Sequence, residues 1–423
     1  MKNGLIVKKR LSGYRKRAVV AGCATLALMG VAACGGGDSS GGDDSRPIKI
    51  GSLHPLTGSS AIEGQVMDKA VKMAVKDINA KGGIKSLDGR KLQVVAADTK
   101  GDPDVGQTAA QRMLDQNVAG IIGAFNSAVT TNVASLAERA KIPLVIDVSA
   151  SKAVIPAGAK NVFRLQPTGV AMGTDGATYL QQLAEQNGST VKKVAVMHEK
   201  SNFGTDVAVA FTKKAKQLGM EVGLTIPYDA AAVTNLTTEL SKVKSYGADV
   251  LVVSGYYNDG LLIARNATAV KPGVQAIFGI AEAAYDQEQF PRDAPDASNG
   301  IYDVNYHYDA SGKAVQELRE RFQTEFKTEM RTTAVYSYEA TLVLADALER
   351  AGSTDPAKVR DALAETDLPQ DLLAFEGSIK FGEDGENVNA AATVMQVQGT
   401  KVPQVFPESV AETKPIWPAV PWK

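Results

Sequence analysis

The sequence is poor in the side chains and motifs on which many enzymes depend. Its 423 residues include three histidines, His54, His198 and His307, and two cysteines, Cys23 and Cys34. The histidines form no H-E-x-x-H pair, and there is no G-x-S-x-G nucleophile elbow, no G-x-x-x-x-G-K-[ST] phosphate loop and no G-x-G-x-x-G after the first expected strand. We therefore expect a protein that is not an enzyme and needs no cofactor or metal.

The first 33 residues are typical of a segment that is removed during export. Seven Lys or Arg residues and no acid lie in this segment, and residues 18–33 are apolar or small, fewer than the ~20 that span a membrane. Val31-Ala32-Ala33-Cys34 resembles the lipobox at which bacterial lipoproteins are cleaved and acylated. Val20-Ala21-Gly22-Cys23 fits the same short pattern after a much shorter apolar stretch. An ordinary secretory signal or a short anchor helix is the alternative.

We accordingly predict a signal peptide over residues 1–33, lipidation of Cys34, and a flexible tether over residues 34–46 that is rich in Gly, Ser and Asp. The anchor would hold the protein at a membrane, in the periplasm or on the outer face of the bacterial cytoplasmic membrane. Cys34 would then be the single remaining thiol, which excludes structural disulfides and thiolate metal sites.

The sequence also lacks an excess of positive charge. Without the seven basic groups of residues 1–33, the total of 46 falls to 39, against 47 acidic groups. A mildly acidic protein of this kind has no electrostatic reason to bind nucleic acid.

Short β-branched runs alternate with amphipathic stretches from residue 47 onward, which predicts α/β architecture with parallel sheets covered by helices on both faces. A first series of strands and helices ends at "NVFRLQPTG", where a second series of similar length begins. The expected helices cover residues 103–116, 127–140, 169–187, 204–218, 234–245, 258–270, 313–328, 334–351 and 355–365. Two lobes of like architecture follow from this repetition.

Several motifs, in this order and spacing, resemble the leucine/isoleucine/valine-binding family, the type I periplasmic substrate-binding proteins of ABC transporters. They are "PLTG", "INAKGGI", "DTKGDP", "FRLQPTG", "VAVMHEKSNFG" and "YSYEATLVLADALERAG". The resemblance implies two Rossmann-like lobes joined by three crossings, formed by residues 47–165 with 306–388 and 166–305 with 389–410. A Pro- and Trp-containing tail covers residues 411–423. The resemblance also implies a monomer that delivers a small ligand to permease subunits.

The resemblance places one end of the ligand in the first lobe. Ser127, at the start of a helix after the third strand, matches a serine that holds the ligand's α-carboxylate, and helix N-termini suit anions. A plain N-cap is the alternative. Ser149 and Ala150 match a small residue and a threonine, with Ser151 adjacent. Glu63 lies near the place where relatives often have a tryptophan, which leaves the side-chain preference open.

The other end of the ligand is expected in the second lobe. Phe203 matches an aromatic that lines the pocket, although a core residue at a helix start is the alternative. Tyr256 and Tyr257 follow a strand, and one of them is expected to face the cleft. Glu282 matches an acid that pairs with the α-ammonium, with a surface glutamate as the alternative. His198, at the end of a predicted strand, is the histidine to test first, although a structural histidine is the better expectation.

The main hypothesis is thus a lipoprotein receptor for a small amino acid of branched-chain or related type. A receptor for short amides, urea or aromatic carboxylates on the same fold remains open, as does a ligand sensor for a signalling partner. A hydrolase on this fold is a further alternative.

Overall fold

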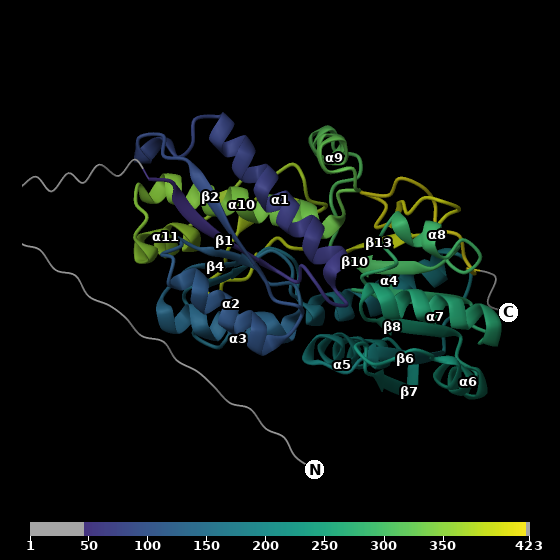
Figure 1. The fold of residues 1–423 in the computed structure, drawn as a ribbon. Coiled ribbons are helices and arrows are strands. Elements are labelled where there is room, and N and C mark those ends of the chain that lie inside the picture. The colour runs from purple at the N-terminus through teal and green to yellow at the C-terminus, as the bar shows by residue number, and fades with distance from the viewer. Residues whose placement is uncertain (1–45, 420–423) are drawn as a thin grey trace, which may run out of the picture. The chain divides into compact units, whose positions relative to one another are not determined.

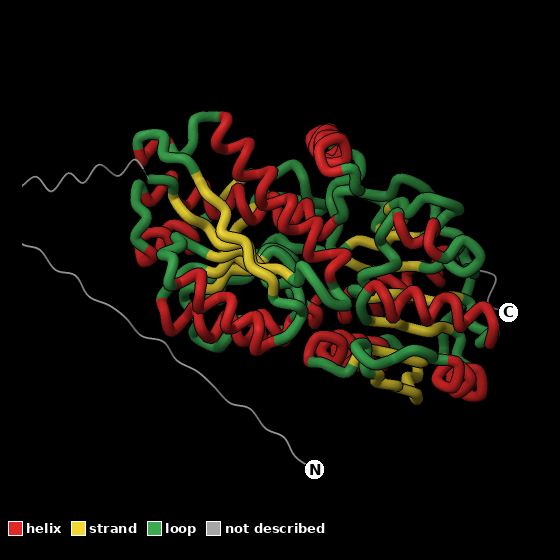
Figure 2. Tube along the Cα trace, in the orientation of Figure 1, coloured by secondary structure: helices red, strands yellow, loops and turns green. Residues whose placement is uncertain are grey.

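The computed structural model describes residues 46–419, so the predicted signal peptide, Cys34 and nearly all of the tether lie outside the described residues. None of the helices in the described part of the chain combines the length and the apolar content that crossing a membrane requires. Within this part, the strands form two large sheets, and helices pack against both (Figure 1; Figure 2). We call each large sheet with its helices a lobe.

The sheet of the first lobe is parallel throughout, in the order β2-β1-β3-β4-β5. Its strands are β1 (Ile48–His54), β2 (Leu92–Asp98), β3 (Ile121–Gly123), β4 (Leu144–Ile146) and β5 (Val162–Arg164). Successive strand residues enter opposite cores: Ile122 packs in the cluster that contains α1 and α10, and Ile121 in the cluster that contains α2 and α3. Burial on both faces explains why these strands are apolar without alternation.

The helices of the first lobe are α1 (Ala61–Ala80), α2 (Pro103–Leu114), α3 (Ser127–Ala140), α9 (Lys313–Phe326), α10 (Thr332–Ala351) and α11 (Pro356–Ala364), with short 3₁₀ turns η1 (Lys85–Leu87) and η2 (Lys152–Val154). Helix α1 packs against α10, and α2 against α3. A small antiparallel pair, β11 (Asp367–Leu368) and β12 (Ile379–Lys380), follows α11. Helix α2 begins as its sequence predicts, because the Asp102 carboxylate accepts hydrogen bonds from the N–H groups of Asp104 and Val105.

The sheet of the second lobe has the order β14-β13-β10-β9-β8-β6-β7. Its strands are β6 (Lys193–Glu199), β7 (Glu221–Tyr228), β8 (Val250–Ser254), β9 (Ala276–Ile280), β10 (Tyr302–Asn305), β13 (Thr393–Gln396) and β14 (Gln404–Phe406), and its helices are α4 (Gly169–Gln186), α5 (Asn202–Gln217), α6 (Thr237–Tyr246), α7 (Tyr257–Val270) and α8 (Gln289–Asp293). Five strands are parallel, but β13 and β14 add antiparallel to β10 and to each other. The parallel core predicted for this lobe is confirmed, and the two antiparallel strands extend the sheet at one edge.

The chain changes lobe three times, after β5, after β10 and before β13. The two-lobed α/β fold predicted from the alternation is thus confirmed, and the lobe boundaries by residue number stay a prediction. The described part of the C-terminal tail packs on the second sheet: Gln396 on β13 exchanges two hydrogen bonds with the backbone of Ile416, at 2.8 and 2.9 Å. The Trp417 ring lies 5.9 Å from that of Tyr302.

Candidate functional site

A pocket lies between the two lobes, at the carboxyl ends of their strands. Its empty space amounts to about 370 Å³, and it is lined by segments that follow β3, β4, β6, β8, β9 and β10. In doubly wound sheets this edge is where ligands bind, because loops from adjacent strands converge there. The lining residues are Phe125, Ser127, Val148, Ser149, Ala150, Phe203, Gly255, Tyr256, Ala281, Ala283, Asn305 and Tyr306.

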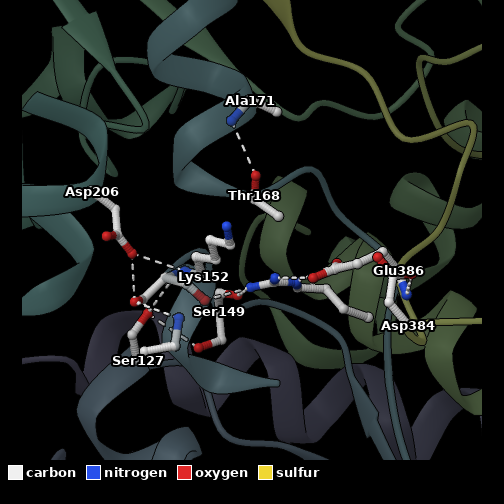
Figure 3. Close-up of polar contacts among 11 residues, drawn as sticks. Ser127, Ser149, Lys152, Thr168, Ala171, Asp206, Asp384 and Glu386 are labelled. Carbon is white, nitrogen blue, oxygen red and sulfur yellow. Dashed lines mark hydrogen bonds and ion pairs between the residues drawn. The ribbon is translucent and has the colours of Figure 1, made fainter. Parts of the chain in front are cut away.

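The first lobe contributes a cluster of serines (Figure 3). The Ser127 hydroxyl oxygen lies 3.2 Å from the Ser149 hydroxyl and accepts a hydrogen bond of 3.2 Å from the backbone N–H of Ser151. Ser127 is the first residue of α3, and the N-cap residue Asn126 makes no side-chain hydrogen bond to the helix. Its amide instead donates to the Ser60 hydroxyl at 3.2 Å. The first turn of α3 therefore presents N–H groups without a side-chain cap, which suits an anionic ligand group.

Aromatic rings form the apolar wall. The Tyr256 ring lies 5.6 Å from Phe203 of the second lobe and 6.1 Å from Phe125 of the first, both in tilted arrangements. Burial, and then the charge of Glu199, raise the pKa of Tyr256, so its hydroxyl keeps its proton. This wall offers apolar contact and quadrupole faces to a small ligand.

The pocket also touches a crossing between the lobes. Asn305 is the last residue of β10, and Tyr306 begins the segment that returns to the first lobe. The Tyr306 ring packs edge-on against Tyr336 of α10, with centroids 4.9 Å apart and an interplanar angle of 70°. A ligand in the pocket thus meets both lobes and the chain that joins them.

Polar contacts between the lobes flank the pocket. Asp206 of α5 accepts hydrogen bonds from the Ser151 hydroxyl at 2.7 Å and from the Lys152 N–H at 2.8 Å (Figure 3). On another side, the Asn258 amide donates to the Ser59 carbonyl at 3.1 Å. These bonds require the lobes to lie together, so they favour the closed arrangement.

Five of the predicted binding residues line the pocket, namely Ser127, Ser149, Ala150, Phe203 and Tyr256. Ser151 is not part of the lining, but its N–H reaches Ser127 and its hydroxyl reaches Asp206. Only one of the two adjacent tyrosines faces the pocket, as expected for consecutive residues at a helix start.

Glu63, Tyr257 and His198 are not part of the pocket lining, and their predicted ligand roles stay predictions. Glu63 is buried in α1, where its carboxylate pairs with Arg331 at 2.5 Å and accepts a hydrogen bond from the Thr333 hydroxyl at 2.7 Å. The Tyr257 hydroxyl donates to Asp293 at 2.7 Å, and the Arg331 guanidinium lies 5.0 Å from the centre of its ring.

His198 lies inside the second lobe. Its Nδ1 is 2.8 Å from the Glu199 carbonyl, and the ring is buried. Because a carbonyl only accepts, this contact places a proton on Nδ1. The surroundings account for the histidine as a structural residue.

Glu282 lies directly behind the pocket wall and not in its lining. Its neighbours Ala281 and Ala283 line the pocket, while the Glu282 side chain is fully buried. A side chain at Gly260 would begin 2.2 Å from Glu282 Oε1, and one at Gly255 would begin 3.0 Å from Oε2. The carboxyl group thus occupies space that these two glycines leave free, on the far side of Gly255.

The Glu282 carboxyl has no hydrogen-bond partner among the described residues. Burial raises its pKa well above the ordinary value, and the nearby Asp259 and Asp303 carboxyls raise it further. The N–H of Ala284 opposes this rise without reaching ordinary hydrogen-bond geometry. Burial likewise raises the pKa of Asp259 to about 7. A cationic group in the pocket would offset the cost of ionising these acids.

Sequence reasoning missed the remaining lining residues: Phe125, Val148, Gly255, Ala281, Ala283, Asn305 and Tyr306. All follow or end a strand, so strand ends were the available signal. Phe125 and Ala281 also have positive φ angles, of 69° and 52°, a left-handed backbone conformation that the residue types phenylalanine and alanine do not predict.

The family follows from this geometry together with comparison of the sequence. A family model described as periplasmic binding protein matches residues 47–401. The chain belongs to this family. The resemblance seen in the sequence motifs is therefore confirmed.

The similarity to other proteins of this family extends over most of the chain. Leu/Ile/Val-binding protein homolog 7 of Brucella abortus (strain 2308) is 28% identical over 375 residues, which cover 87% of this chain and 93% of that protein. The branched-chain amino acid transporter substrate-binding protein LivJ of Streptococcus pneumoniae, in complex with isoleucine, has a TM-score of 0.75 at 23% identity, covering 86% of this chain and 100% of that one. A solute-binding protein of R. palustris in complex with benzoate has a TM-score of 0.72 at 19% identity, covering 86% and 99%. These neighbours share the fold.

Proposed function

We propose that this protein is a non-catalytic, extracytoplasmic receptor that binds a small amino acid, of branched-chain or related type, and delivers it to the permease of an ABC transporter. The observation that carries the proposal is the interlobe pocket, which joins a serine cluster at a helix N-terminus to an aromatic wall. The names of the relatives support an amino-acid ligand, and the family supports a place outside the cytoplasm.

The α-carboxylate would lie at the serine cluster. Ser127 and Ser149 offer hydroxyls, and the first turn of α3 offers N–H groups, so a negative group gains several donors without meeting an acid in the lining. The hydrocarbon side chain would rest on Phe203 and Tyr256.

The α-ammonium would face the wall at Gly255 and Ala281, behind which Glu282 lies. A positive charge at that point favours the ionised form of Glu282, and binding would then release a proton from the buried acids. The ligand would thus provide the cation that this group of carboxyls lacks.

Calorimetry with a panel of amino acids tests the proposal. We expect a dissociation constant below ~100 μM for at least one of them. Ser127→Ala should weaken that binding at least tenfold, since a hydrogen bond to a charged group is worth ~1.5–3 kcal/mol. Ser135→Ala, a serine of the same helix that donates only to the Thr131 carbonyl, is the matched control and should bind normally. No binding by any amino acid would overturn the ligand assignment.

One observation favours a second candidate, a carboxylate that carries no ammonium group. The lining itself contains no acid, and the raised pKa of Glu282 keeps that side chain neutral while no cation is near. Glu282→Gln separates the candidates by calorimetry. The variant should lose affinity for an amino acid and should keep or improve its affinity for an aromatic carboxylate such as benzoate.

The lipid anchor stays a prediction, because Cys34 lies outside the described residues. Cells that express the full chain and are fed a labelled fatty acid should label the protein, and Cys34→Ala should abolish the label. Label on Cys34→Ala would refute the assignment of this cysteine.

A further inference from the structure

One buried arginine stands directly behind the serine cluster. Arg164, the last residue of β5, is fully buried, and a buried guanidinium is costly unless its donors are satisfied. Its Nη1 donates to the carbonyls of Ser149 and Ser151, at 2.8 and 2.7 Å. Its Nε donates to Glu386 Oε2 at 2.8 Å, and Nη2 pairs with Glu386 Oε1. Figure 3 shows Ser149 and Glu386 at opposite ends of this chain of contacts.

These bonds decide which way the pocket loop faces. The carbonyls of Ser149 and Ser151 accept hydrogen bonds from Arg164, and that of Ala150 accepts from the Gly169 N–H at 2.6 Å, so all three carbonyls already have donors outside the pocket lining. The Ser151 N–H is left to donate to the Ser127 hydroxyl. The backbone acceptors of residues 149–151 are thus engaged by other groups, while Ser149 and Ala150 line the pocket.

Glu386 in turn is fixed by the backbone. The turn that precedes it lies along β5, where the Arg164 N–H donates to the Gly385 carbonyl at 2.9 Å and the Asn387 N–H donates to the Arg164 carbonyl at 3.0 Å. Asn387 begins the last crossing toward β13. A carboxylate held here can orient the guanidinium with two bonds, which lysine could not reproduce.

We propose that Arg164, oriented by Glu386, is a positioning residue that holds the loop of residues 149–151 in the conformation that receives the ligand's carboxylate. This inference deepens the proposed function and rests on it for the identity of the bound group. The orientation of the loop itself can be tested without any ligand.

Hydrogen exchange of the ligand-free protein, followed in peptides covering residues 148–153, is the first test. Arg164→Met should speed exchange in this segment by at least ~tenfold and leave the α1 and α2 peptides unchanged. Arg350→Met is the matched control: Arg350 donates to Asp346, Thr366 and the Ala362 carbonyl, away from the pocket. It should leave residues 148–153 unchanged. Unchanged exchange in Arg164→Met, or an equal rise throughout the first lobe, overturns the proposal.

Glu386→Gln keeps the shape of the Arg164–Glu386 pair and replaces Arg164→Met in the exchange experiment if Arg164→Met does not fold. Unchanged exchange in residues 148–153, or an equal rise throughout the first lobe, would again overturn the proposal.

L-leucine binding is the second test. Arg164→Lys and Ser127→Ala should each weaken it, and the double variant should be no weaker than the worse single variant within about twofold, because both act on one group. Additive losses would overturn the positioning role. If wild-type protein binds no amino acid, the proposed function fails while the exchange result still decides the role of Arg164.

Discussion

Replacing Asp206 by alanine removes two hydrogen bonds that join the lobes beside the pocket. The carboxylate accepts from the Ser151 hydroxyl at 2.7 Å and the Lys152 N–H at 2.8 Å, both on the loop after β4. Neither bond can form when α5 moves away from that loop. The change should therefore destabilise the ligand-bound, closed protein more than the open one.

The size of the effect follows from the two bonds. A hydrogen bond to a charged group contributes ~1.5–3 kcal/mol when buried, but Asp206 is only partly buried, so we take ~1 kcal/mol for each bond. A total of ~2 kcal/mol corresponds to a roughly 30-fold weaker affinity. In the proposed closure these bonds form after the ligand has entered, so the dissociation rate should rise by about that factor while the association rate changes little.

Stopped-flow measurements with the best ligand of the amino-acid panel would give both rates. Asp206→Asn should lie between wild type and Asp206→Ala, because an amide oxygen still accepts but carries no charge. Thr205→Ala, an exposed neighbour on the same helix, should behave as wild type. A dissociation rate that stays within twofold of wild type in Asp206→Ala would refute the view that this carboxylate stabilises closure.

Two stability predictions concern buried acids. Burial, and then the charge of Asp371, raise the pKa of Glu339 from 4.5 to about 8. Between these two pH values the folded protein keeps a proton on Glu339 that the unfolded chain has lost. The free energy of unfolding should therefore fall as the pH rises from 4.5 to 8, by at most ~5 kcal/mol. Thermal unfolding across this range should show Glu339→Gln to be less sensitive to pH, and equal slopes would contradict the assignment. Glu63→Ala leaves the buried Arg331 guanidinium without its carboxylate, which should cost ~3–5 kcal/mol in denaturant unfolding; a loss below 1 kcal/mol would indicate that Arg331 finds another partner.

Helix positions were the most predictable part of the structure. The predicted helix over 127–140 agrees with α3, because a polar residue precedes an apolar repeat that is buried against the sheet. The direction of the strands was harder to predict from the sequence. The antiparallel pairing of β13 with β10 depends on the path of the preceding crossing and not on the residues of β13.

The direction in which individual side chains point was the hardest feature to predict from the sequence. Ser127 and Tyr256, chosen because each follows a strand, line the pocket, yet the same rule could not show that Tyr257 turns toward Asp293. Glu282 points away from the pocket because Gly255 and Gly260, distant in sequence, leave room behind the wall. These side-chain directions are determined by packing between segments that are distant in the sequence, and the local sequence pattern carries no information on that packing.

Tyr306 combines two duties that are usually kept apart. Its ring packs on Tyr336 of the first lobe, while Asn305, one residue earlier, still belongs to the second sheet, and both residues line the pocket. A substitution of Tyr306 would therefore change the crossing between the lobes as well as the pocket surface, and we expect the affinity and the rate of ligand release to change together. Phe203 belongs to α5 and not to a crossing, and is the better starting point for an engineer who wants to change one without the other.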